Sequence, residues 1–128
     1  MGISVEPPGP ADPITPQTSH ASFGSVTGPA AGGTIIATAA LPAGVYKVDL
    51  YLRISGTITA AEENNMQLLN GAAVQNQLPV QAPAATVAAD PPITQYKASN
   101  ATTFSVQAIA AAGVAAVYTV LIVATQVG

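Results

Sequence analysis

The 128-residue sequence has no cysteine, no tryptophan and very few charged side chains. Without cysteine, the chain cannot form a disulfide framework, a thiolate metal site or a cysteine nucleophile. Charged residues make up only 7% of the sequence, and three basic residues cannot neutralise enough phosphates for a nucleic-acid interface. A net charge of only -3 also removes a common defence against self-association, so we expect the molecule to work in an assembly.

Groups suited to catalysis or metal binding are equally scarce. The single histidine, His20, lies near Ser19 and Ser22, but no glycine-flanked nucleophile elbow surrounds a serine, so we interpret His20 as an exposed strand-edge residue. Two glutamates and two asparagines at 62–65 could be paired carboxylates or a weak calcium site. The spacing of a calcium loop is absent, and solvated loop carboxylates are the simpler interpretation. We therefore expect no enzyme activity, no cofactor and no metal.

The clearest structural signal is the stretch from Leu41 to Thr57. After a Pro-Ala-Gly turn, apolar and polar residues alternate with the period of two that is typical of a half-buried strand. The apolar positions are Tyr46, Val48, Leu50, Leu52 and Ile54, and the polar ones are Lys47, Asp49, Tyr51 and Arg53. The pattern predicts a central strand whose first set faces the core and whose second set faces solvent.

Shorter strands are predicted on both sides of this one. They cover 20–26 with Phe23 turned inward, 34–40, 66–69, 72–78, 93–98, 102–110 and 115–125, with a long surface crossing over 81–90. Asn70-Gly71 between two of them is a strong hairpin signal, because both turn positions then take positive φ. No helix is expected. The count predicts an all-β fold, a single sandwich of about eight short antiparallel strands, jelly-roll-like rather than immunoglobulin-like because no Cys-Trp-Cys core is present.

Residues 1–17 read as a separate extended arm ahead of a sandwich domain at 18–128. Five prolines in the arm exclude helix and central-strand pairing. The arm also lacks the basic and apolar regions of a secretory signal, so we expect synthesis in a cytoplasm. Ile3, Val5 and Ile14 are spaced among the prolines, and a purely disordered linker would have little use for them. Two interpretations stay open: an arm that becomes ordered on a neighbouring subunit or surface, and a floppy tail.

The C-terminal segment is apolar on both faces of its predicted strand. From Ala108 to Ala124 it carries no charge, and its length is at the lower limit for a membrane-spanning helix. Gly113, the β-branched second half and the lack of flanking basic residues favour two strands, so we expect no membrane contact. A strand that is apolar on both faces is either central or part of an interface. The predicted interface residues are Ile3, Val5, Ile14, Tyr118, Val120 and Ile122.

The Pro-Ala-Gly turn before the 45–54 strand, the LLNGAAV hairpin at 68–74, the Ala/Thr/Gly-rich strands and the proline arm together resemble small jelly-roll virion proteins of tailed bacteriophages, of the head-decoration (cement) or fibre-head type. The resemblance implies a structural virion protein on the capsid exterior, made in the host cytoplasm. It also implies partners: copies of the chain itself, as a homotrimer, and the major capsid protein. No functional residue is carried over from it.

An alternative function is recognition of a carbohydrate or a receptor by a sandwich module of a fibre or an adhesin. Tyr51 is the candidate ligand-facing residue, because it lies on the polar side of the predicted central strand. The competing interpretation is that the tyrosines close the rim of the sandwich, with the ring buried and the hydroxyl in water.

Overall fold

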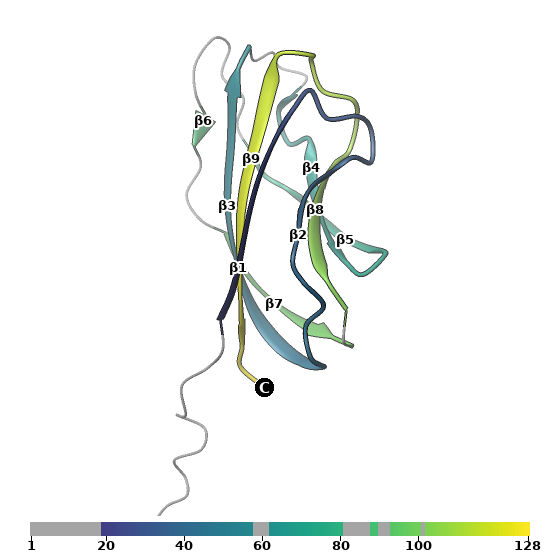
Figure 1. Cartoon of the computed structure of the whole chain (residues 1–128), viewed down its shortest axis with the longest axis vertical. Helices are drawn as coiled ribbons and strands as arrows, with labels where there is room; N and C mark the ends of the chain where they lie inside the picture. The colour runs from purple at the N-terminus through teal and green to yellow at the C-terminus, as the bar shows by residue number, and fades with distance from the viewer. Residues whose placement is uncertain (1–18, 58–61, 81–87, 90–92, 101) are drawn as a thin grey trace, which may run out of the picture.

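The computed structural model of the chain describes residues 19–57, 62–80, 88–89, 93–100 and 102–128 (Figure 1). In these residues there are nine strands and no α-helix, so the predicted all-β architecture is confirmed. The strands are β1 (Ser19–Thr27), β2 (Thr34–Ala37), β3 (Gly44–Gly56), β4 (Met66–Asn70), β5 (Ala73–Leu78), β6 (Ala88–Ala89), β7 (Ile93–Ser99), β8 (Phe104–Ala108) and β9 (Ala116–Gln126). The predicted arm and most of the predicted crossing lie outside the described residues.

The strands form two antiparallel sheets that pack face to face (Figure 1). Sheet A has the order β1-β9-β3, and β7 and β6 pair one after the other with the remaining edge of β3. Sheet B has the order β2-β8-β4-β5. Four of the pairings are nested along the chain: β1 with β9, β2 with β8, β3 with β7, and β4 with β5. Two further pairings, β3 with β9 and β4 with β8, close this ribbon into the two sheets.

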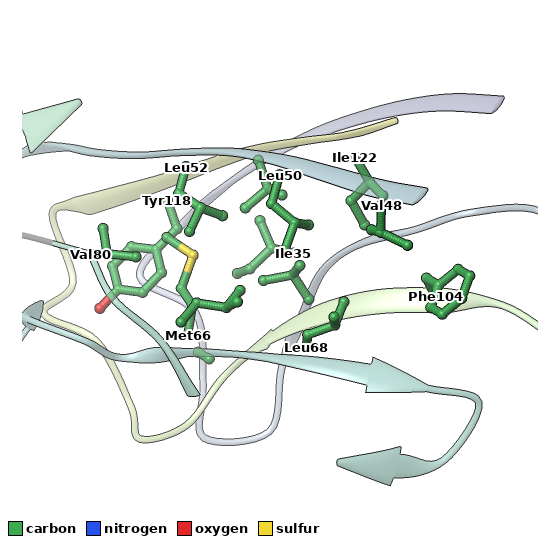
Figure 2. Packing of buried hydrophobic residues seen from close by; sticks show 14 of the residues in the cluster. Ile35, Val48, Leu50, Leu52, Met66, Leu68, Val80, Phe104, Tyr118 and Ile122 are labelled. Atoms are coloured by element: carbon green, nitrogen blue, oxygen red, sulfur yellow. The ribbon is translucent and has the colours of Figure 1, made fainter. Parts of the chain in front are cut away.

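The predicted central strand is confirmed as β3, which pairs with β9 on one side and with β7 and β6 on the other. Its predicted core residues are all buried, and they meet buried residues of β4, β8 and β9 between the sheets (Figure 2). At one end of the core, the rings of Tyr46 and Phe104 pack edge to face, with a distance of 6.0 Å between the ring centroids. This arrangement favours an aromatic pair because the positive ring edge meets the negative ring face.

The predicted hairpin is also confirmed, but its tip lies one residue later than expected. Asn70 pairs with Ala73, which leaves Gly71 and Ala72 as the two-residue loop. Gly71 has a φ of 63°, whereas neither Asn70 nor Ala72 has a positive φ. Positive φ at the first loop position alone is typical of a type II′ turn, which places glycine there. Asn70 therefore ends the strand and does not form part of the turn.

The predicted orientation of Phe23 is wrong. β1 is present, but Phe23 points away from the core and is 66% exposed. The cause is its neighbour Gly24, which faces the inside at a point where β2 comes very close. A Cβ atom on Gly24 would lie 2.4 Å from the carbonyl oxygen of Ile35. Because successive side chains of a strand alternate, the inward position of Gly24 forces Phe23 outward.

The apolar segment at 108–124 forms the end of β8, a loop and β9, as the two-strand interpretation predicted. Among the described residues, no helix is long and apolar enough to cross a membrane. β9 is central in sheet A, between β1 and β3. One of its two apolar faces is therefore core, and the other belongs to the outer face of the sheet.

Candidate functional site

The aromatic residues divide evenly between the core and one outer surface. The chain has two phenylalanines and four tyrosines. Tyr46, Phe104 and Tyr118 are completely buried between the sheets. The other three, Phe23, Tyr51 and Tyr96, are 66%, 43% and 65% exposed. All three lie on the outer face of sheet A, because each alternates with inward-facing neighbours on its strand.

The strand register places Phe23 and Tyr51 in one row and Tyr96 four positions away along β3. Phe23 on β1 and Tyr51 on β3 both pair with Leu121 of β9, so the three side chains form one row across three strands. Tyr96 on β7 pairs with Lys47, further along β3 on the same face. The half-buried Val123 follows Leu121 two residues along β9. We call the surface formed by Phe23, Tyr51, Tyr96, Leu121 and Val123 the aromatic face.

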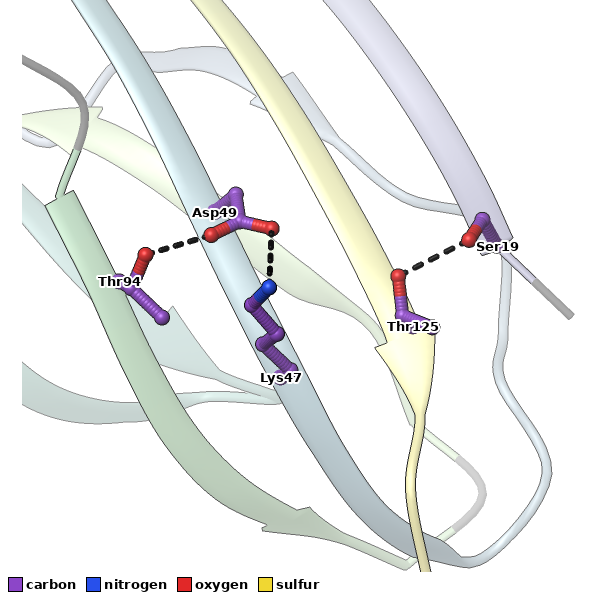
Figure 3. Close-up of polar contacts among 5 residues, drawn as sticks. All are labelled: Ser19, Lys47, Asp49, Thr94 and Thr125. Atoms are coloured by element: carbon purple, nitrogen blue, oxygen red, sulfur yellow. Dashed lines mark hydrogen bonds and ion pairs between the residues drawn. The ribbon is translucent and has the colours of Figure 1, made fainter. Parts of the chain in front are cut away.

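Short polar side chains hold the strands together around the aromatic face. The hydroxyl groups of Ser19 and Thr125 lie 2.9 Å apart between β1 and β9 (Figure 3). On β7, the Thr94 hydroxyl donates a hydrogen bond of 2.6 Å to Asp49 of β3. Cross-strand pairs of this kind each add modestly to the stability of a sheet. They satisfy one another's polar atoms, so the exposed aromatic side chains lie beside polar groups that are already paired.

Few charged side chains lie on the described part of this outer face. Lys47 and Arg53 are two of the three basic residues of the whole chain, and both lie on the outer side of β3. The Lys47 Nζ atom lies 3.9 Å from a carboxylate oxygen of Asp49 (Figure 3). Arg53 forms no ion pair with any residue that the structure describes. Counted over the residues that the structure describes, the outer face therefore carries two basic side chains and one acidic one, on a chain whose net charge is -3.

Half of the predicted interface set lies in the core. Tyr118, Val120 and Ile122 face inward from β9 and have no exposed surface. They cannot contact a partner while the two sheets stay packed. The outward residues of β9 are those between them, including Leu121 and Val123. The pattern showed that both faces of β9 were apolar but gave no signal of which face was which. Ile3, Val5 and Ile14 lie outside the described residues.

The alternative candidate, Tyr51, lies where the sequence predicted, on the outer side of the central strand. Its partners on that surface were not predicted. Phe23 was assigned to the core, and Tyr96 was placed on a strand without an orientation. The signal that could have identified Phe23 is the glycine beside it, since a glycine within a strand often marks a close approach of another backbone.

The interpretation of 62–65 as solvated carboxylates is wrong for Glu62. Its side chain is only 1% exposed, and its Oε1 atom accepts a 2.9 Å hydrogen bond from the hydroxyl group of Tyr118. The backbone N–H of Gly113 points to the same oxygen at 3.4 Å. A carboxylate is tolerated in the interior when hydrogen bonds replace its water shell. Glu63 is exposed, as expected for a solvated glutamate.

Asn65 completes this buried cluster. Its amide group donates to the Tyr118 hydroxyl and to the carbonyl oxygen of Ala110, both at 2.9 Å, and its Oδ1 atom accepts from the N–H of Ala110 at 2.8 Å. Burial, reinforced by the Glu62 carboxylate, raises the pKa of Tyr118 to about 12. The hydrogen bonds of this cluster connect the loop before β9 with the turn before β4. Within the described residues, no group of three or more metal-ligating side chains is present.

His20 and the two serines near it, Ser19 and Ser22, all lie on β1. His20 is half-buried on the inner side of β1, and not exposed as the sequence suggested. Ser19 points to the opposite side of the strand, where its hydroxyl contacts Thr125. The strand alternation therefore separates Ser19 from His20, whereas Ser22 lies on the inner side of β1 together with His20. Comparison of the chain with protein-family models, with curated proteins and with solved structures gave no match.

Proposed function

We propose that the chain is a non-catalytic structural protein of a virion, a capsid-decoration protein of jelly-roll fold that associates with copies of itself and docks on a protein shell. The observation that carries this proposal is the aromatic face. Three large aromatic side chains are exposed on the outer face of one sheet, in a chain of which only 7% is charged. Aromatic residues are enriched at protein interfaces, whereas charged residues are depleted at interface cores.

The jelly-roll assignment is supported by the nested strand pairs. A jelly roll has eight strands in two sheets and combines two Greek keys. The pairs β1 with β9, β2 with β8, β3 with β7, and β4 with β5 account for eight strands, and the two-residue β6 continues the edge that β7 begins. Rolling such a ribbon brings β3 beside β9 and β4 beside β8, which are the remaining observed pairings.

The proposed partners follow from the phage resemblance together with this surface. The chain forms a homotrimer on the capsid exterior and contacts the major capsid protein after synthesis in the host cytoplasm. The buried cluster of Glu62, Asn65 and Tyr118 has a structural role in this proposal, since its polar atoms are occupied by one another and by loop backbone. The chain needs no cofactor for such a role.

Light scattering coupled to size-exclusion chromatography tests the self-association. We expect the full chain to elute with three times the mass of the 12.7 kDa monomer at high micromolar concentration. The double variant Phe23→Ser/Tyr51→Ser should shift to monomer. Val74→Ser is the matched control, because Val74 is 57% exposed on sheet B. A wild-type chain that stays monomeric at every concentration would contradict the proposed self-association.

Carbohydrate recognition is the second candidate, and one observation favours it. Tyr51 and Tyr96 are exposed on the same flat side of sheet A, where sugar rings could stack on them. This function predicts glycan binding that Tyr51→Ala abolishes while the fold, measured by circular dichroism, is unchanged. The two candidates separate cleanly: a glycan array without signal removes recognition of sugars and leaves the assembly role untouched.

A further inference from the structure

The proline-rich arm has a period of three residues that matches a polyproline II helix. Between residues 5 and 16, each set of positions three apart has its own chemical character. One set is Pro7, Pro10, Pro13 and Pro16; the second is Glu6, Gly9, Asp12 and Thr15; the third is Val5, Pro8, Ala11 and Ile14. Polyproline II has three residues per turn, so each set would line one ridge. The sequence thus predicts a strip with a proline ridge, an acidic ridge and an apolar ridge.

The spacing of the acidic residues matches the spacing of the basic residues on the outer side of β3. Glu6 and Asp12 are six positions apart, which spans about 19 Å in polyproline II. Lys47 and Arg53 are also six positions apart, which spans about 20 Å along a strand. Tyr51 lies between these two basic residues on the same side of β3. A strip laid along β3 can therefore meet both charges and place its other ridges on the aromatic face.

The acidic and proline residues of the arm complement the basic and aromatic residues on the outer side of β3. Residues 1–18 contain two acidic residues and neither lysine nor arginine. The outer side of β3 carries Arg53, which has no ion-pair partner among the described residues, and Lys47, whose contact with Asp49 is 3.9 Å long. Proline-rich segments with this spacing bind surfaces lined by aromatic side chains, because a polyproline II strip loses little entropy on docking.

A neighbouring copy fits the arm better than its own domain. The arm joins β1 at Ser19, the first residue of a strand at the edge of sheet A. To fold back over its own sheet, the chain would have to reverse within Gln17 and Thr18, directly after Pro16. Two-residue reversals favour glycine, asparagine or aspartate, because these residues accept positive φ. A β-branched threonine does not readily accept positive φ.

We propose that residues 5–16 of one copy lie along β3 of a neighbouring copy, with Glu6 and Asp12 opposite Lys47 and Arg53 and the proline ridge on the aromatic face. This inference rests on the proposed self-association and specifies its mechanism. Each copy then gives an arm and receives one. Such an exchange around a closed ring contributes a contact at every junction between copies.

Cross-linking of the full chain tests where the arm lies, because the absence of cysteine leaves no background reaction. Unlabelled Ala11→Cys protein is mixed with nitrogen-15-labelled Thr119→Cys or Thr125→Cys protein and treated with a short bismaleimide. Thr119 pairs with Arg53, and Thr125 pairs with Lys47. Because Ala11 precedes Asp12, which is placed opposite Arg53, we expect dimers of mixed isotope content with Thr119→Cys, fewer with Thr125→Cys, and none with the control Ala37→Cys on sheet B, all detected by intact-mass spectrometry.

Charge reversal tests the pairing itself. Arg53→Glu should weaken association about tenfold in sedimentation velocity, since an attractive pair becomes repulsive, and adding Asp12→Lys should restore it. Lys97→Glu is the control, because it makes the same change of charge on the inner side of β7. We expect it to leave association unchanged. Oligomers without mixed dimers, or with equal cross-linking to Ala37→Cys, or without rescue, would overturn the arm docking and leave self-association standing. A monomeric wild-type chain would remove both.

Discussion

Phe23 and Tyr51 lie in the same row of sheet A, two strands apart, because both pair with Leu121 on the strand between them. The two residues are 28 positions apart in the sequence, and only the order β1-β9-β3 brings them together. Their side chains are 66% and 43% exposed. Apolar surface of this kind is lost from water only if another molecule covers it, which makes this row the centre of the proposed interface.

The first prediction concerns the dependence of thermal stability on protein concentration. If copies associate through this row, the oligomer is favoured by mass action, and the midpoint of thermal unfolding should rise with protein concentration. In Phe23→Ser/Tyr51→Ser the midpoint should become independent of concentration. Differential scanning calorimetry at several concentrations measures this. A concentration dependence that persists in the double variant would show that another surface carries the association.

The organisation of β3 could be predicted from the sequence because one strand faces core and solvent with a strict period of two. Every inward position from Tyr46 to Ile54 is buried, as its hydropathy indicates. Gly71 located the hairpin to within one residue for a similar reason, since few residues other than glycine tolerate the positive φ that the tight turn requires there. In both cases the signal is local, and the rest of the fold only has to agree with it.

The errors arose where the deciding contact is distant in the sequence. Phe23 was assigned to the core on hydrophobicity, but the approach of Ile35 to Gly24 fixes the opposite orientation. Glu62 looked like a solvated loop residue, but Tyr118, 56 positions later, provides a buried hydrogen bond. No periodicity within one segment contains either contact. The division of the aromatic residues between core and surface therefore became visible only with the strand register.

The second prediction follows from the close approach at Gly24. Gly24→Ala should lower the free energy of unfolding by about 1–3 kcal/mol, because a Cβ atom would lie 2.4 Å from the carbonyl oxygen of Ile35 and the strands would have to separate. Gly113→Ala is the control, since its Cβ would meet only a side-chain oxygen of Glu62, at 3.3 Å. Urea unfolding measures both. Equal losses for the two variants would contradict the packing described for β1 and β2.

The third prediction compares two buried tyrosines by removing the hydroxyl group of each. Tyr118→Phe takes a donor from the buried Glu62 carboxylate and an acceptor from Asn65, so we expect a loss of about 1–3 kcal/mol in unfolding free energy. Tyr46→Phe removes one hydrogen bond to the carbonyl oxygen of Pro42 near the surface, and its loss should be smaller. Urea unfolding at neutral pH ranks the two variants. A larger loss for Tyr46→Phe would contradict the structural importance of the Glu62 cluster.

The fourth prediction concerns stability at alkaline pH. The pKa of Tyr118 is about 12 in the folded chain, whereas the ordinary value for a tyrosine is 10.0. A phenol with a raised pKa holds its proton more tightly in the folded state, so its full contribution is present below pH 10 and is lost as the pH rises towards 12. We expect the wild-type chain to lose on the order of 2 kcal/mol of unfolding free energy across this range from Tyr118 alone. Tyr118→Phe, which has no proton to lose at this position, should show a correspondingly smaller decline when both proteins are unfolded with urea at a series of pH values. Parallel declines in the two proteins would show that the Tyr118 phenol ionises equally easily in the folded and unfolded chains, and would remove the electrostatic role assigned to its burial beside Glu62.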